Sequence, residues 1–208
     1  MCMIADAGSP AWSDGDTICW KLVEYVLDKN GKQVAFTPYR FTRIPDEILR
    51  GESDMKAAGE DKYEDLRKYQ EWPIVSGGYI HTYAELDPKQ IVEDVAYLRS
   101  AIGRREDYMT PCMVKDMPDV DEYPTVSAFA LFRCVIPGRT MMFKGRADCP
   151  NETPNYASKR VRFVERVGYW DTRCPDTGCE MFASKVRDIC EKESAIAARS
   201  ASAAAEQE

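Results

Sequence analysis

The sequence has very little histidine and no long apolar run. His81 is the single histidine among 208 residues, so any mechanism that needs an imidazole has to use it. No stretch approaches the roughly 18–20 apolar residues of a membrane-spanning helix. The first ten residues, MCMIADAGSP, lack the basic and apolar segments of a signal peptide. We therefore expect a cytoplasmic, bacterial protein with no membrane partner.

Common catalytic and nucleotide-binding motifs are also missing. GxxxxGK[ST], GxGxxG, HExxH and GxSxG do not occur. The net charge is -7, and this acidity disfavours nucleic acid as a partner. Hydrophobic residues make up 44% and charged residues 30%, which is typical of a folded globular chain with its own core. In the cytoplasm the eight cysteines are expected to be mostly reduced thiols.

The clearest strand pair lies near the N-terminus. Residues 1–16 are small and polar and predict an irregular lead-in. Residues 18–27, ICWKLVEYVL, alternate in the manner of a strand. Asn30-Gly31 is typical of a two-residue hairpin turn, and residues 34–37 supply the returning strand.

The next segments are less regular. Pro45 and the acidic residues after it predict a short helical turn that ends at Gly51. Residues 60–72 carry opposite charges at helical spacing and predict a surface helix or a mobile insertion. Residues 73–84, PIVSGGYIHTYA, predict a strand whose glycines mark a bulge or a close backbone approach.

The strongest helix signal spans residues 87–103. Asp87 is a typical N-cap, Pro88 suits the first helical position, and Gln90 has capping-box spacing. Gly103 is a typical C-terminal stop. Apolar residues at helical spacing predict one buried stripe, formed by Ile91, Val95, Leu98 and Ile102.

The second half of the chain predicts more strands and a final helix. VSAFALFRCVIP, residues 126–137, is nearly all apolar and predicts a central strand covered on both faces. The remaining predictions are a polar connection at 104–125, a strand at 139–145, a loop at 146–155, a half-exposed strand at 156–169, a helix at 180–198 and a fraying tail at 199–208. Together they favour one α+β domain over residues 17–198, with a mainly antiparallel sheet, one strong amphipathic helix and a C-terminal helix.

Two cysteines are spaced closely enough to share a metal ion. Cys174 and Cys179 flank a turn-forming PDTG, and a zinc site takes about four such ligands. Cys149, Cys190 or His81 would complete the set. Because a second closely spaced pair is missing, the alternative is buried, unligated thiols. We predict no cofactor, with zinc as one alternative.

Two other residues are candidates for catalysis. Cys2 would become an N-terminal nucleophile if Met1 were removed, but the residues after it interrupt the strand that such enzymes need. His81 would serve as a general base only with a nucleophile and an orienting carboxylate. We expect His81 instead to fix the corner between the strand and the helix that follows, with a role in a pocket as the alternative.

Arginines line one side of the strand at 156–169. Arg160, Arg162 and Arg166 face away from Val161, Phe163 and Val167. Such a face pairs with phosphate groups in some proteins and is only solvated in others.

Several segments, taken in order, resemble a loosely defined family of small proteins from gut bacteria and their phages. They are MC at the start, CWKLV at 19–23, TPYRF at 37–41, GGYIHTY at 77–83, CVIPGRTMMFKG at 134–145 and YASKRVRF at 156–163. The resemblance covers most of residues 1–168. It implies a phage or mobile-element protein and carries no activity with it.

A weaker resemblance links GGYIHTYAELDPKQIVEDV to ADP-ribosyltransferase-like folds, in which a glycine-led strand runs into a helix. There, a histidine and a tyrosine position NAD and a later glutamate is catalytic. The resemblance implies Tyr39, His81 and Tyr83 as ligand-binding residues, Glu165 with His81 and Tyr83 as catalytic candidates, and NAD as cofactor.

Two functions follow from these observations. The first is an accessory or interaction protein of a phage or mobile element, which binds a protein partner and has no catalytic constellation. The second is an ADP-ribosyltransferase-like or other nucleotide-binding enzyme with a pocket around His81.

Overall fold

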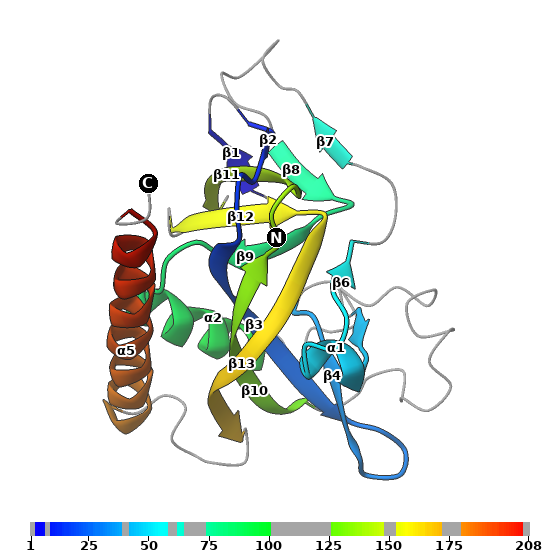
Figure 1. Cartoon of the computed structure of the whole chain (residues 1–208). Helices are drawn as coiled ribbons and strands as arrows, with labels where there is room; N and C mark the ends of the chain where they lie inside the picture. The colour runs from blue at the N-terminus through cyan, green and yellow to red at the C-terminus, as the bar shows by residue number, and fades with distance from the viewer. Residues whose placement is uncertain are drawn as a thin grey trace. The chain divides into compact units, whose positions relative to one another are not determined.

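The computed structural model describes residues 3–6, 9–38, 42–57, 62–64, 74–100, 126–147, 153–171 and 180–205. It has a mainly antiparallel sheet together with the helices α1 (Asp46–Leu49), α2 (Pro88–Ser100) and α5 (Glu180–Ala205) (Figure 1). The predicted α+β class, with an antiparallel sheet and a C-terminal helix, is therefore confirmed. Within the described segments, no helix is long and apolar enough to cross a membrane.

The chain divides into two compact units, and three of the five boundaries fall inside the long strands β3 (Thr17–Leu27), β10 (Val126–Ile136) and β13 (Arg160–Asp171). Unit 1 contains Met1–Lys21, Glu47–Leu86 and Arg133–Glu165. Unit 2 contains Leu22–Asp46, Asp87–Phe132 and Arg166–Glu208. The single domain over residues 17–198 stays a prediction.

Unit 1 is built almost entirely from strands. Its shorter strands are β1 (Met3–Ala5), β2 (Ala11–Trp12), β6 (Met55–Lys56), β7 (Lys62–Glu64), β8 (Ile74–Gly77), β9 (Ile80–Tyr83), β11 (Met141–Ala147) and β12 (Pro154–Ser158). The hydrogen-bonded order is β6-β13-β10-β3-β9-β12-β11-β1-β8-β7, and β2 pairs with β11 (Figure 1). A buried apolar cluster holds these strands together: Met3, Ala5, Val75, Tyr79, Phe143 and Ala157.

The irregular lead-in predicted for residues 1–16 is wrong at β1 and β2. Met3 and Ala5 are fully buried, and β1 pairs antiparallel with both β11 and β8. The sequence signal is weak because β1 is only three residues long, and its partners come from far along the chain. Long-range pairing therefore decides its structure, while local propensity does not.

Two further predictions in unit 1 are corrected. The strand expected at 73–84 is two strands, because Gly78 has a φ of 69° and turns the chain between β8 and β9. The helix expected at 60–72 is wrong at Lys62–Glu64, which form β7 on the edge of β8, and the rest of that range lies outside the described residues. Edge pairing supplies backbone hydrogen bonds there, and the predicted helix had little apolar surface to bury.

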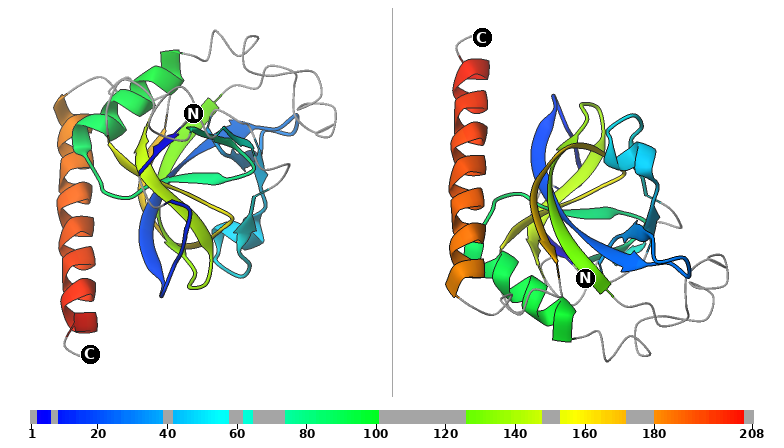
Figure 2. Two further views of the ribbon diagram at one scale, coloured as in Figure 1. Left: turned by 90° about the horizontal axis from the view of Figure 1, so that it is seen from above. Right: turned by 90° about the horizontal axis from the view of Figure 1, so that it is seen from below.

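Unit 2 places helices against a smaller group of strands. The second half of β3 pairs with β4 (Gln33–Phe36), and β4 pairs with β5 (Arg43–Ile44). Helix α5 packs on one face of β13, where Trp170 meets Phe182 with ring centroids 5.4 Å apart. Helices α2 and α5 are in contact, and Figure 2 shows α5 as one continuous helix beside α2.

The predicted hairpin is confirmed, but its turn is of a different type. Asn30-Gly31 suggested a turn that needs positive φ at both residues. Gly31 has a φ of 75°, and Asn30 is not among the residues with positive φ. Asp28 organises a longer loop. Its backbone amide donates to the Lys32 carbonyl, its carbonyl accepts from the Gly31 amide, and its carboxylate accepts from the amides of Asn30 and Lys32. Gly31 therefore occupies the left-handed position of a bulged three-residue turn.

Helix α2 begins where the sequence predicted. The carboxylate of Asp87 accepts from the Lys89 amide at 2.9 Å, as an N-cap does. The amide of Gln90 donates to Asp94 within the helix. Gln90 and Asp94 are both buried, so the buried face is partly polar and the description as one strong amphipathic helix is not confirmed. Ile102 and Gly103 lie outside the described residues.

The later elements agree with the sequence in type more than in extent. Strand β10 is buried along almost its whole length, as its apolar sequence predicted. At the start of β13, Val161 and Phe163 are buried, as predicted. Further along the strand the buried positions are Gly168 and Trp170, so the alternation of buried and exposed residues shifts by one position. Val167, predicted to share the buried face, is therefore only half-buried. Helix α5 continues past residue 198 to Ala205.

Candidate functional site

The predicted catalytic residues of unit 1 lie on different strands. His81 is on β9 opposite Ala157, both its ring nitrogens are buried, and its carbonyl accepts from the Lys21 amine at 2.9 Å. Glu165 is on β13, about half exposed, in an ion pair with Arg133. In the order β13-β10-β3-β9 they are separated by three strand spacings, about 14 Å along the sheet at about 4.8 Å per strand. The structure therefore does not bring His81 and Glu165 together.

The tyrosines implied by the ADP-ribosyltransferase resemblance are placed only in part. Tyr83 is buried on β9, with Asn155 opposite it on β12 and Trp20 opposite it on β3. Tyr39 lies outside the described residues. The roles of Tyr39, His81 and Tyr83 in ligand binding, and of His81 at the strand-to-helix corner, stay predictions.

The cysteines predicted to bind zinc fall mostly outside the described residues. Cys174, Cys179 and Cys149 are not described, and neither is Cys2. Cys190 lies buried on α5, where burial, and then nearby carboxylates, raise the pKa of its thiol to about 12. Within the described residues, no group of three or more histidine, cysteine or acidic side chains is arranged to hold a metal.

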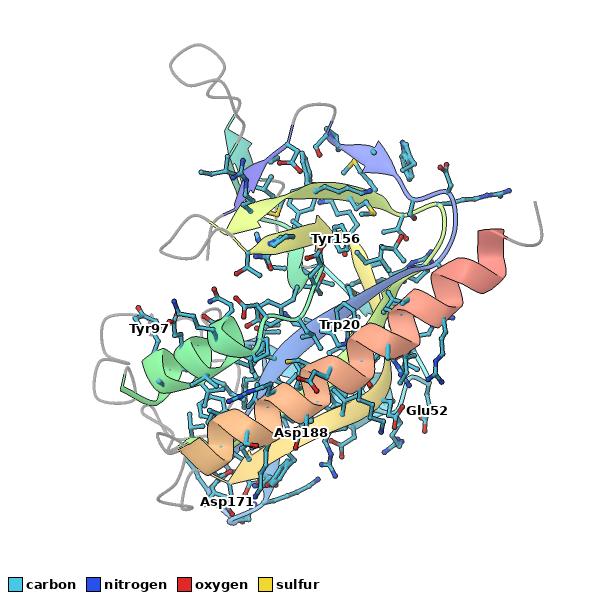
Figure 3. All side chains as sticks on the ribbon, turned by 90° about the vertical axis from the view of Figure 1, so that its left-hand side faces the viewer. Trp20, Glu52, Tyr97, Tyr156, Asp171 and Asp188 are labelled. Atoms are coloured by element: carbon cyan, nitrogen blue, oxygen red, sulfur yellow. The ribbon has the colours of Figure 1, made fainter. Side chains whose placement is uncertain are left out.

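A buried polar cluster in unit 1 was missed by the sequence pattern. Burial raises the pKa of the Cys19 thiol to about 12, against the opposing effect of the Thr82 hydroxyl and the Lys21 amine. Burial also raises the pKa of Cys134 well above its usual range. Both thiols are fully buried and protonated at neutral pH, so neither is an available nucleophile. The nearby Tyr156, on β12 (Figure 3), has its pKa raised first by burial and then by Cys19 and Glu85.

The arginine face of β13 is occupied by a single carboxylate. Asp54 contacts Arg162 at 2.8 Å and Arg160 at 3.4 Å, and its side chain is only 13% exposed. This contact raises the pKa of Arg162. In unit 2, the Arg166 guanidinium lies over the Tyr169 ring, 5.1 Å from its centroid. Arg160 and Arg162 are thus already paired with a carboxylate, while Arg166 contacts an aromatic ring.

The most exposed large apolar side chain in unit 1 belongs to Trp12, on β2. Its exposed fraction is 69%, the largest among the described large hydrophobic residues. Trp12 lies opposite Met141, next to the turn that joins β10 to β11. In that turn Arg139 has a φ of 59°, a left-handed conformation that costs a non-glycine residue about 1–2 kcal/mol.

The residue after Trp12 fixes this turn. Ser13 is buried, and its hydroxyl donates to the Pro137 carbonyl at 2.9 Å and accepts from the Thr140 amide at 3.0 Å. Its backbone amide donates to the Thr140 carbonyl, and its carbonyl accepts from the Arg139 amide at 2.8 Å. Asp16 also accepts from the Gly138 amide at 2.9 Å. We call residues 11–16 the strap, because they hold the turn in place.

The strap and the turn fix the backbone from which two exposed side chains extend. The Trp12 indole is exposed, and the Arg139 side chain is exposed with no hydrogen bond or ion pair in the described structure. Backbone strain persists only where surrounding contacts enforce it, and such sites are often functional. Trp and Arg are also enriched among residues that dominate binding energy at protein interfaces. The sequence signal for this site was weak, because Trp12 gains its neighbours only through pairing with β11.

Comparisons with family models, curated proteins and solved structures found no match. The resemblances to gut-bacterial and phage proteins and to ADP-ribosyltransferase-like folds therefore stay predictions.

Proposed function

We propose that this protein is a non-enzymatic accessory protein that binds a protein partner through Trp12 and Arg139. The observation that carries this is an exposed indole and an arginine with positive φ, on two segments that the buried Ser13 joins by hydrogen bonds. An interface anchor gains affinity when it is ordered before binding, because less conformational entropy is then lost. The resemblance to small phage proteins supports an accessory role in a phage or mobile element.

The chemistry of the surface suits a protein more than a nucleotide. A buried tryptophan removes a large apolar area from water on binding, and an arginine donates to carbonyl or carboxylate oxygens. The net charge of -7 disfavours a polyanionic partner. Exposed acids, Asp14 and Asp16, lie in the strap close to Trp12 in the sequence.

Site-specific photo-crosslinking in the source cell tests the proposal. The photoreactive residue p-benzoyl-phenylalanine replaces Ala11, which is exposed next to Trp12, in one variant and Tyr97, which is 44% exposed on α2, in a control. We expect one defined cross-linked protein from position 11, weakened by the additional change Trp12→Ala or Arg139→Glu. Equal cross-linking from both positions, or none from position 11, would contradict the proposal.

A further inference from the structure

The backbone of β2 has one edge that β11 does not use. Trp12 lies opposite Met141. On the other side of β11, the Met141 carbonyl accepts from the backbone amide of Lys159 at 3.3 Å. The next residue, Ser13, turns its amide toward Thr140. In an antiparallel pair these orientations alternate, so Trp12 and Met141 form a non-hydrogen-bonded pair. The N–H and C=O of Trp12 therefore point away from β11.

No other described strand takes up this edge. β2 pairs with β11 alone, whereas β1, on the same side of β11, is also covered by β8. The edge is short, as natural edge strands often are, with Pro10 before Trp12 and the exposed Asp14 after it. At Trp12 it offers one backbone donor and one acceptor beside an exposed indole.

We infer that an extended segment of the partner adds to this edge as a further strand. The inference rests on the proposed function and specifies how the partner binds. A backbone donor and acceptor at an open edge is the arrangement used in strand addition, where main-chain bonds give affinity and side chains give specificity. The segment has a residue with a backbone N–H opposite Trp12 and an apolar side chain that covers the indole.

Charge favours basic residues in that segment. The chain carries a net charge of -7, and Asp14, two residues beyond Trp12, is exposed. Complementary charge speeds association and selects among partners. The partner class is therefore an extended peptide with an apolar residue next to lysine or arginine.

Selection from a displayed library of random linear 12-residue peptides on the full chain provides the probe. We expect selected peptides to combine apolar and basic residues. Trp12→Ala weakens their binding by about 30-fold or more, which is typical of an interface hot spot, and the matched control Tyr97→Ala leaves it unchanged. Trp12 is exposed, so its replacement leaves the fold intact, and the melting curve of the variant verifies this.

A second measurement uses the unchanged protein. Methylating the backbone nitrogen of the peptide residue opposite Trp12 removes a donor but keeps every side chain, and we expect it to abolish binding. Hydrogen exchange of the Trp12 amide slows when peptide is bound. A library that yields no peptide, peptides indifferent to Trp12→Ala, or tolerance of N-methylation at every position would each overturn the inference. Cross-linking from position 11 would still support the proposed function, so the two fail separately.

Discussion

Replacing Ser13 by alanine is expected to destabilise unit 1 far more than replacing Ser9. The two serines make the same kind of contact with β11. The Ser13 hydroxyl donates to Pro137 at 2.9 Å and accepts from Thr140 at 3.0 Å. The Ser9 hydroxyl donates to the Lys144 carbonyl at 3.3 Å and accepts from its amide at 3.2 Å. They differ in burial, since Ser13 is 7% exposed and the Ser9 contacts are exposed.

Burial sets the magnitude. In Ser13→Ala, the Pro137 carbonyl and the Thr140 amide both lose a partner, and a buried unsatisfied group costs about 1–3 kcal/mol. We expect a loss of about 2–4 kcal/mol in the free energy of unfolding, because water reaches part of the gap. In Ser9→Ala, water replaces the hydroxyl, and the loss is about 0.5 kcal/mol or less.

Urea denaturation of both variants measures this difference, and hydrogen exchange locates it. The Thr140 amide should exchange slowly in the native protein and in Ser9→Ala, and much faster in Ser13→Ala. If Ser9→Ala costs as much as Ser13→Ala, or if Thr140 stays protected in Ser13→Ala, the strap does not hold the turn and the reasoning is refuted.

Four further predictions test other parts of the structure. The thiols of Cys19 and Cys134 should resist a thiol reagent at pH 8 until the chain unfolds, and rapid labelling of these two thiols in the native chain would contradict this expectation. Burial raises the pKa of both thiols, so the thiols of the unfolded chain ionise first, and the free energy of unfolding should fall as pH rises from about 9 toward 12. Gly145→Ala should abolish folding at 37 °C by placing a Cβ against the β1 backbone, whereas Gly15→Ala, which meets nothing within 4 Å, should have the native melting temperature. Arg139→Gly should raise stability by about 0.5–1 kcal/mol through relief of the positive φ while weakening partner binding, and unchanged binding would count against the site. NAD, ADP-ribose or Zn²⁺ at millimolar concentration should not raise the melting temperature, and a clear rise with NAD would favour the alternative enzyme over the accessory protein.

The sequence predicted those elements whose signals are local. Asp87 and Pro88 mark the start of α2 because an N-cap and a first-turn proline act within a few residues. The apolar run at 126–137 predicted β10, since only a strand covered on both faces tolerates such a run. The hairpin after β3 was predicted for the same reason, although Asp28 gave it a different turn.

The rest depends on contacts between residues that are far apart in sequence. Ser13 bonds to residues 124 and 127 positions away, and no local pattern near Ser13 contains that information. The alternation in β3 places Cys19 and Lys21 on the opposite face of the strand from Trp20, yet all three side chains are buried. A period of two shows which residues share a face, but it does not show whether that face is covered.

The candidate site illustrates why function was harder to predict than fold. The conformation of Arg139 is unfavourable on its own, and asparagine or glycine would adopt it at lower cost. Ser13 and Asp16 maintain it through five hydrogen bonds. The Ser13 amide donates to the Thr140 carbonyl, and the Ser13 hydroxyl donates to the Pro137 carbonyl. The Arg139 amide donates to the Ser13 carbonyl, the Thr140 amide to the Ser13 hydroxyl, and the Gly138 amide to the Asp16 carboxylate. A turn that needed only to reverse the chain gains nothing from arginine at that position. What the strained backbone provides is an exposed arginine side chain on the turn that pairs with the strap. This is the physical reason to place partner binding at this turn.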